Sequence, residues 1–371
     1  MKLTAKIEKH KESLIALSLS FVKGIGSKRA KRILTEADLY QEWCYCFNSG
    51  FKELPQWSNK QLAKSDFENA VDLANNQLTD AVDNSVIPLS INHPFYPKLL
   101  KQCIDAPSLL YARGNVERLN YESVSIVGTR TPSEYGRKNA KQIAGELAAE
   151  GLNVVSGFAY GVDINAHLAS IDNGGFTVAV FGSGLGCIYP AVHKKYVSKI
   201  LENGCLLSEQ PYYAKPDRQN FPSRNRIVAG MSKATLVIES KIKGGSLITA
   251  KLAFDYNRDV YALPGLVQDE KYDGNHQLIK LNIAQLCTSS NDILQQTFEK
   301  QKTEHEPKQN LNREYPKEYQ KIVHAIRSGA NNIHALSDVS EENIASLQMR
   351  LVQMELDGYL KMLPGNKLRL L

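Results

Sequence analysis

The fold is decided by residues 123–157, which read SVSIVGTRTPSEYGRKNAKQIAGELAAEGLNVVSG. Residues 123–127 form a short apolar run with several β-branched side chains, which predicts a buried strand. Residues 134–150 carry apolar side chains at helical spacing, and residues 153–156 form a second short apolar run. A strand, a helix and a strand in this order predict two parallel strands joined by a helical crossover.

The same alternation continues to about residue 288. The expected strands are Ser123–Val127, Asn153–Ser156, Thr177–Phe181, Ala234–Ile238 and Asp259–Leu263. The expected helices are Glu134–Glu150, Val162–Asn173, Ala191–Asn203 and Ser246–Tyr256. We therefore predict an α/β fold with a parallel sheet covered on both faces, and ligands beyond the carboxyl ends of the strands.

Composition indicates an ordinary globular protein of two or three domains. The chain has 371 residues, 43% of them hydrophobic, and 45 Lys and Arg against 39 Asp and Glu give a net charge of +6. Such a small net charge means that a polyanion site requires local clustering of cations. The sequence shows no membrane span. Six scattered cysteines predict reduced thiols, no metal site and a cytoplasmic location.

Four segments are expected along the chain. Residues 1–84 form a helical N-terminal domain, in which the turn at 22–26 predicts a helix-hairpin-helix, and residues 85–296 form the domain with the parallel sheet. Residues 297–311 are polar and predict a linker. Residues 312–371, with three helical patterns and a terminal hairpin around Pro364-Gly365, predict a winged helix that is a protein-contact or regulatory module rather than a DNA-binding one.

Glycine-rich turns follow three of the expected strands. Gly128-Thr129-Arg130 comes before a helix, where backbone N–H groups and a guanidinium can bind an anion. The turn after the second strand contains Gly157 and Gly161. A third turn, with Lys243, Gly245, Ser246 and Thr249, opens another helix. Since these strands are parallel, the three turns are expected at one edge of the sheet.

The densest basic segment is residues 215–243, with seven Lys and Arg against two acids. Arg218, Phe221, Arg224, Asn225 and Arg226 lie in its first half. Cations along a backbone together with an aromatic ring are typical of a single-stranded nucleic-acid groove. A solvated basic loop with a core phenylalanine is the alternative.

Two enzymatic interpretations are weaker. Asp163 and His167 share a helix face near Ser156, as in a hydrolase triad, but Ser156 has no nucleophile-elbow motif, and the pair is expected to support the loop. The glycines at 182–186 have Cys187 where the third glycine of a dinucleotide fingerprint belongs, which disfavours a nicotinamide cofactor. We expect no cofactor.

Ordered motifs over nearly the whole chain resemble the DprA/Smf family of DNA-processing proteins. They include Ile126–Arg130, Ser156–Ala159 with Asp163 and His167, Ile188–Pro190, Phe221-Pro222 with Arg224–Arg226, Ser246–Ala250, and Gly274-Asn275. Asn282 stands where glycine is usual in the family.

The resemblance implies an extended Rossmann-like domain behind a small helical (SAM-like) N-terminal domain, often followed by a winged helix. It implies a homodimer without catalytic activity that binds and protects single-stranded DNA. Such a dimer displaces or cooperates with single-strand-binding protein and loads the RecA recombinase during natural transformation. Arg130 with Gly128 and Thr129 should hold a phosphate, Phe221 should lie near a base, and Asn275 should support the loops.

A nucleotide-processing enzyme related to phosphoribohydrolases is the alternative function. Such enzymes carry a Gly-Gly-x-Gly-Thr loop followed by a catalytic glutamate. Here Gly244-Gly245 is followed by Ser246–Thr249, with no glutamate behind it. The sequence therefore favours a binding protein.

Overall fold

The computed structural model describes residues 5–58, 61–299, 315–328, 333–340, 343–363 and 367–370. Contacts within the chain divide it into two compact units, residues 1–297 and 298–371, each with its own buried core. From residue 300 onward, the predicted linker lies outside the described residues. The four domain boundaries named above stay predictions.

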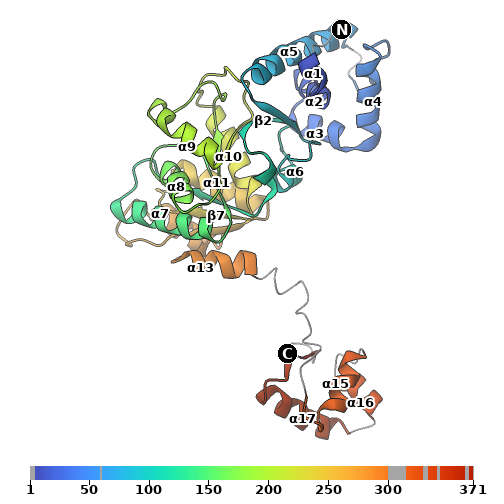
Figure 1. Ribbon diagram of the computed structural model, residues 1–371, viewed down its shortest axis with the longest axis vertical. Coiled ribbons are helices and arrows are strands. Elements are labelled where there is room, and N and C mark those ends of the chain that lie inside the picture. Colours follow the sequence, from blue (N-terminus) through green and yellow to red (C-terminus); the bar gives the residue numbers. More distant parts are fainter. Residues whose placement is uncertain are drawn as a thin grey trace. The chain divides into compact units, whose positions relative to one another are not determined.

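A nine-stranded sheet forms the centre of the first unit, counted over its described residues (Figure 1). Its order is β1-β2-β6-β5-β4-β3-β7-β8-β9. The strands are β1 Ile87–Ser90, β2 Leu109–Gly114, β3 Ser123–Val127, β4 Asn153–Ser156, β5 Thr177–Phe181, β6 Gly204–Ser208, β7 Ala234–Val237, β8 Asp259–Ala262 and β9 Gln285–Leu286. All neighbours from β6 to β9 are parallel, and β1 and β2 extend the sheet antiparallel. The predicted α/β fold with a parallel sheet is confirmed.

The central strands match the sequence prediction because they are buried along their whole length. Every residue of β3, β4, β5 and β7 is buried, so both faces of the sheet need apolar side chains. β3, β4 and β5 have the predicted bounds, and β7 and β8 are each one residue shorter.

Helices cover the sheet. They are α6 Lys98–Gln102, η1 Glu117–Asn120, α7 Glu134–Ala149, α8 Val162–Asp172, η2 Ala191–Tyr196, α9 Val197–Glu202, α10 Asn220–Met231, α11 Gly245–Asp255, α12 Asp273–Lys280, α13 Ser290–Ile293 and the π-helical η3 Leu294–Glu299. The helix predicted at 191–203 is divided into the 3-10 turn η2 and α9. α10 was not predicted, and it turns part of the basic segment into a helix.

Among the described residues before the sheet there are five helices: α1 Ala5–Glu8, α2 Lys11–Phe21, α3 Ser27–Thr35, α4 Ala37–Asn48 and α5 Lys64–Asp83. Trp43 and Phe51 form their aromatic core, with ring centroids 5.6 Å apart. The hydroxyl of Ser13 donates to the Pro88 carbonyl at 3.0 Å, which ties α2 to β1. Gly24, between α2 and α3, has a φ of +83°, which favours glycine. The helix-hairpin-helix assignment stays a prediction.

The second unit contains α15 Gln320–Arg327, α16 Ile333–Ser340, α17 Ile344–Leu356, β10 Leu360–Leu363 and β11 Lys367–Leu370. β10 and β11 pair antiparallel, with Leu360 opposite Leu370. Leu336, Leu347 and Leu351 are fully buried in its core. The predicted turn at Pro364-Gly365 lies outside the described residues. The winged-helix assignment stays a prediction.

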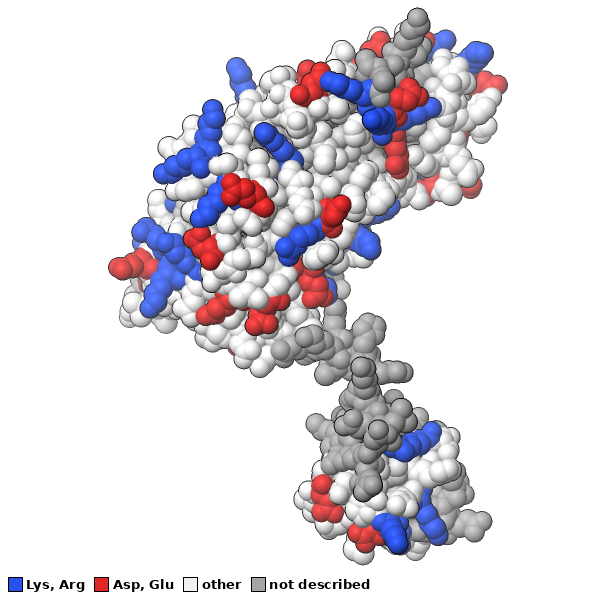
Figure 2. All heavy atoms as spheres, viewed as in Figure 1, with Lys and Arg blue, Asp and Glu red and all other residues white. Residues whose placement is uncertain are grey.

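Charge is mixed on the face drawn in Figure 2, where Lys and Arg side chains alternate with Asp and Glu rather than form one continuous basic surface. All six cysteines are free thiols. In the described part of the chain, no helix is both long and apolar enough to cross a membrane.

Candidate nucleic-acid interface

A pocket of about 810 Å³ opens at the carboxyl ends of the parallel strands. The loop after β3, the start of α10, and the loop between β7 and α11 line it. Eleven residues predicted to bind DNA lie in this lining: Gly128, Thr129, Arg130, Arg218, Phe221, Arg224, Asn225, Lys243, Gly245, Ser246 and Thr249. The structure therefore brings together turns that are more than 100 residues apart in the sequence.

The loop after β3 fits closely against its neighbours. A Cβ at Gly128 would lie 2.6 Å from Cγ2 of Val162, so a side chain there would displace α8. Gly161 has a φ of +75°, and its Cβ would lie 2.4 Å from the Thr129 carbonyl oxygen. Gly161 does not line the pocket but supports the Gly128–Arg130 turn from behind.

Glu239 anchors the same loop and was not predicted. Its carbonyl oxygen accepts from the Thr129 N–H at 2.8 Å. Its fully buried carboxylate accepts from the N–H and hydroxyl of Ser133, at 3.0 and 2.7 Å, and from the Tyr272 hydroxyl at 3.1 Å. Glu239 thus fixes both ends of the segment carrying Arg130. In the sequence, the only indication of this role is that Glu239 directly follows the apolar run of β7.

Arg224 lies in the floor of the pocket rather than at its surface. The side chain is 8% exposed, and its Nη1 lies 3.9 Å from Oδ2 of Asp163. A Cβ at Gly157 would overlap the Arg224 guanidinium, so glycine is required there. Burial raises the pKa of Asp163 and lowers that of Arg224, while their mutual attraction opposes both shifts. Gly157 therefore makes room for Arg224 and is not itself in the lining.

Asp163 contacts the loop after β4, whereas His167 does not join it. Oδ2 of Asp163 accepts from the N–H groups of Gly157 at 3.1 Å and Ala159 at 3.2 Å. Nδ1 of His167 instead lies 2.6 Å from the Thr177 hydroxyl, on β5. Burial lowers the pKa of His167 to about 3, so the ring is neutral. With His167 directed to β5, the geometry does not assemble the hydrolase triad considered above.

Asn275 holds strand ends together. Its amide nitrogen donates to the carbonyls of Val237, Ile238 and Leu263 at 2.8–3.1 Å. Val237 is the last residue of β7, and Ile238 and Leu263 directly follow β7 and β8. Asn275 is fully buried, and its predicted role as a loop support stays a prediction.

Phe221 and Arg130 meet in the pocket. The Arg130 guanidinium carbon lies 5.7 Å from the Phe221 ring centroid, a cation–π contact. Phe221 also packs on Gly182, whose Cβ would lie 3.1 Å from Cδ1 of the ring, and beside Tyr189. Arg130 is exposed whereas Phe221 is half-buried.

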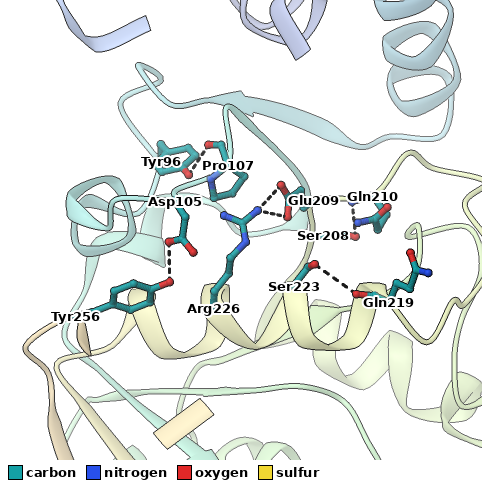
Figure 3. Close-up of polar contacts among 10 residues, drawn as sticks. All are labelled: Tyr96, Asp105, Pro107, Ser208, Glu209, Gln210, Gln219, Ser223, Arg226 and Tyr256. Carbon is teal, nitrogen blue, oxygen red and sulfur yellow. Dashed lines mark hydrogen bonds and ion pairs between the residues drawn. The ribbon is translucent and has the colours of Figure 1, made fainter. Parts of the chain in front are cut away.

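Arg226 lies outside the pocket lining. Its Nη2 bonds both carboxylate oxygens of Glu209, at 2.5 and 2.6 Å (Figure 3). The Tyr256 hydroxyl beside this pair donates to Asp105 at 2.6 Å. Burial raises the pKa of Glu209, and the Arg226 charge opposes that shift. Arg226 thus makes a structural contact with Glu209, and its predicted contact with DNA stays a prediction.

Four exposed cations surround the opening: Arg130, Arg218, Lys241 and Lys243. Lys241 was not among the predicted site residues, and its ammonium lies 3.2 Å from the exposed carboxylate of Glu270. The only acid in the lining, Asp163, is buried beneath Arg224. The opening therefore favours a polyanion. No cluster of three metal-ligating side chains occurs within the described ranges.

The space beside the glycines at 182–186 is occupied by another segment of the chain. Gly184 would place a Cβ 2.0 Å from the Pro211 carbonyl oxygen, and Gly186 would place one 2.7 Å from the Tyr212 ring. These glycines admit the 211–212 backbone and leave no cradle for a dinucleotide.

The part of the chain that contains the pocket matches a known protein family. The family model "DNA recombination-mediator protein A" matches residues 88–298, which contain the whole pocket. The chain belongs to the DNA recombination-mediator protein A family, DprA/Smf. Protein Smf of Synechocystis is 34% identical over 287 residues, covering 75% of this chain and 71% of the relative. DprA of Streptococcus pneumoniae is 41% identical over 205 residues, covering 55% and 72%.

Solved DprA structures share the fold. That of S. pneumoniae DprA superimposes with a TM-score of 0.60 at 33% identity, covering 74% of this chain and 98% of that one. DprA of Helicobacter pylori, solved in work on its unique single-stranded DNA binding mode, gives a TM-score of 0.53 at 30% identity, covering 58% and 96%.

Proposed function

We propose that this chain binds single-stranded DNA in the pocket and acts in the cytoplasm as a recombination mediator. It protects an incoming strand and loads the RecA recombinase during natural transformation, without altering the strand covalently. The single observation that carries the proposal is the convergence of Arg130, Arg218, Lys243 and Phe221 on one pocket in a member of this family. RecA and single-strand-binding protein are the proposed partners.

The pocket chemistry suits an unpaired strand. Its cations can bind successive phosphates, and its aromatic rings can contact bases that have left a stack. In a duplex those bases stay paired unless the cost of unstacking is met. A homodimer would place two such pockets on one strand, which raises the overall affinity through effective concentration. We therefore expect a strong preference for single over double strands.

A phosphoribohydrolase-like activity is the second candidate. Ser246, where such an enzyme would continue its glycine loop, is buried and donates to the Ser240 hydroxyl at 2.7 Å. This loop holds its own serines together and offers no carboxylate to a ribose. Its geometry supports anion binding rather than hydrolysis.

Fluorescence anisotropy with single- and double-stranded oligonucleotides of equal length tests the proposal. We expect tight, salt-dependent binding of the single strand and much weaker binding of the duplex. Equal affinity for both forms would contradict the proposal. A parallel assay of nucleoside monophosphate hydrolysis should show no turnover, and turnover would favour the enzyme.

A further inference from the structure

The pocket has an aromatic border that the assigned residues do not include. Tyr160 and Tyr189 are each 41% exposed, although both are large rings next to buried structure. Tyr189 is part of the pocket lining, and Tyr160 follows Ala159, which also lines it. We call these two residues the tyrosine surface.

Phe221 itself has little free ring. Arg130 lies over it at 5.7 Å, Gly182 packs against Cδ1, and the Tyr189 ring lies 5.6 Å away at 57°. A base needs an open ring face on which to stack. The contacts with Arg130, Gly182 and Tyr189 cover much of the Phe221 ring. The more exposed ring of Tyr189, held in place by Phe221, provides that face.

Tyr160 is fixed in a comparable way. Its ring meets His193 edge-on, with centroids 5.1 Å apart, and His193 is buried with Nδ1 3.1 Å from the Phe158 carbonyl oxygen. A ring held by a buried neighbour loses little conformational entropy when a ligand stacks on it. Lys194 and Lys195, which follow His193 in η2, are exposed.

We propose that the tyrosine surface is a base-stacking subsite for the part of the strand that leaves the pocket. Tyr189 and Tyr160 each stack one unpaired base, and Lys194 contacts the backbone alongside. The ligand is single-stranded nucleic acid, because phosphates and bases alternate along it as cations and rings do here. This proposal rests on the proposed function and extends the same site.

Fluorescence anisotropy with two single strands of about 20 nucleotides tests the subsite. One strand is oligo-dT, and the other has the same length and charge but lacks its bases. Tyr160→Ala and Tyr189→Ala should each lower affinity for the base-containing strand roughly 5- to 140-fold. Affinity for the abasic strand should not change. Tyr160→Phe and Tyr189→Phe keep the rings and should bind both strands as the unaltered chain does.

The outcomes separate the two proposals. If the unaltered chain does not bind the base-containing strand, the proposed function fails and the subsite fails with it. If it binds but the alanine variants bind equally well, or lose equal affinity for both strands, the subsite alone is wrong. Photocrosslinking of the unaltered chain to an iododeoxyuridine strand needs no variant to fold. Adducts on Tyr160 or Tyr189 would support the subsite, and adducts confined to other residues would overturn it.

Discussion

Replacing Arg130 with alanine gives a prediction whose size follows from the pocket. Arg130 is exposed, so the change leaves the core intact and acts on the ligand. It removes a charge-assisted phosphate contact of about 1.5–3 kcal/mol, or roughly a 12- to 140-fold loss of affinity. Four exposed cations at the opening correspond to a slope of about −2.8 in log K against log salt for a single strand. Arg130→Ala should reduce its magnitude to about 2.1.

Anisotropy with an oligo-dT strand across a salt series measures both quantities. Arg130→Lys is the matched control, because it keeps the charge but loses the guanidinium fork. It should keep the salt slope while recovering only part of the affinity. An alanine variant with unchanged affinity and slope would remove Arg130 from the binding site and refute the reasoning.

Three further predictions concern the loop anchor Glu239, the buried side chain of His167 and the second unit. Glu239→Ala leaves the Ser133 and Tyr272 donors without their buried acceptor, so urea unfolding should show a loss of about 2–3 kcal/mol; unchanged stability would show that Glu239 is no anchor. The folded pKa of His167, about 3, lies below its unfolded value, so its contribution to stability is complete above pH 6.5 and is lost as the pH falls toward 3. Between pH 7 and pH 5 the free energy of unfolding should fall by about 2 kcal/mol, and this fall should be absent in His167→Asn. An equal pH dependence of stability in both proteins would contradict this. Deleting residues 312–371 should leave strand affinity nearly unchanged, and a large loss in a gel shift would place the second unit in the binding site.

The parallel strands could be predicted because strands that are buried on both faces consist of continuous runs of apolar residues. β3, β4 and β5 are short apolar runs between helical patterns, and their bounds were predicted correctly. α10 could not be predicted, because its buried apolar side chains lie together at its end, after the polar stretch around Arg224 and Arg226, and leave no helical spacing over the whole segment. Asn282, where glycine is usual in the family, has a φ of +54°, a conformation that asparagine tolerates better than most residues.

The pocket could be predicted in outline because parallel strands bring their following turns to one edge. Spacing alone did not show which arginine faces the ligand. Arg224 and Arg226 are two residues apart on α10, so they point in different directions, one to Asp163 and the other to Glu209. The anchoring role of Glu239 depends on contacts with Ser133 and Thr129, more than 100 residues earlier, which no local pattern encodes.

The central claim is that glycine-supported turns at the carboxyl edge of the sheet bind an unpaired strand. A crystal structure of the chain with a bound thymidine oligonucleotide tests it most directly. We predict phosphates beside Arg130 and Lys243 and a base within the aromatic border of the pocket. A strand bound on another surface, with this pocket empty, would contradict the account.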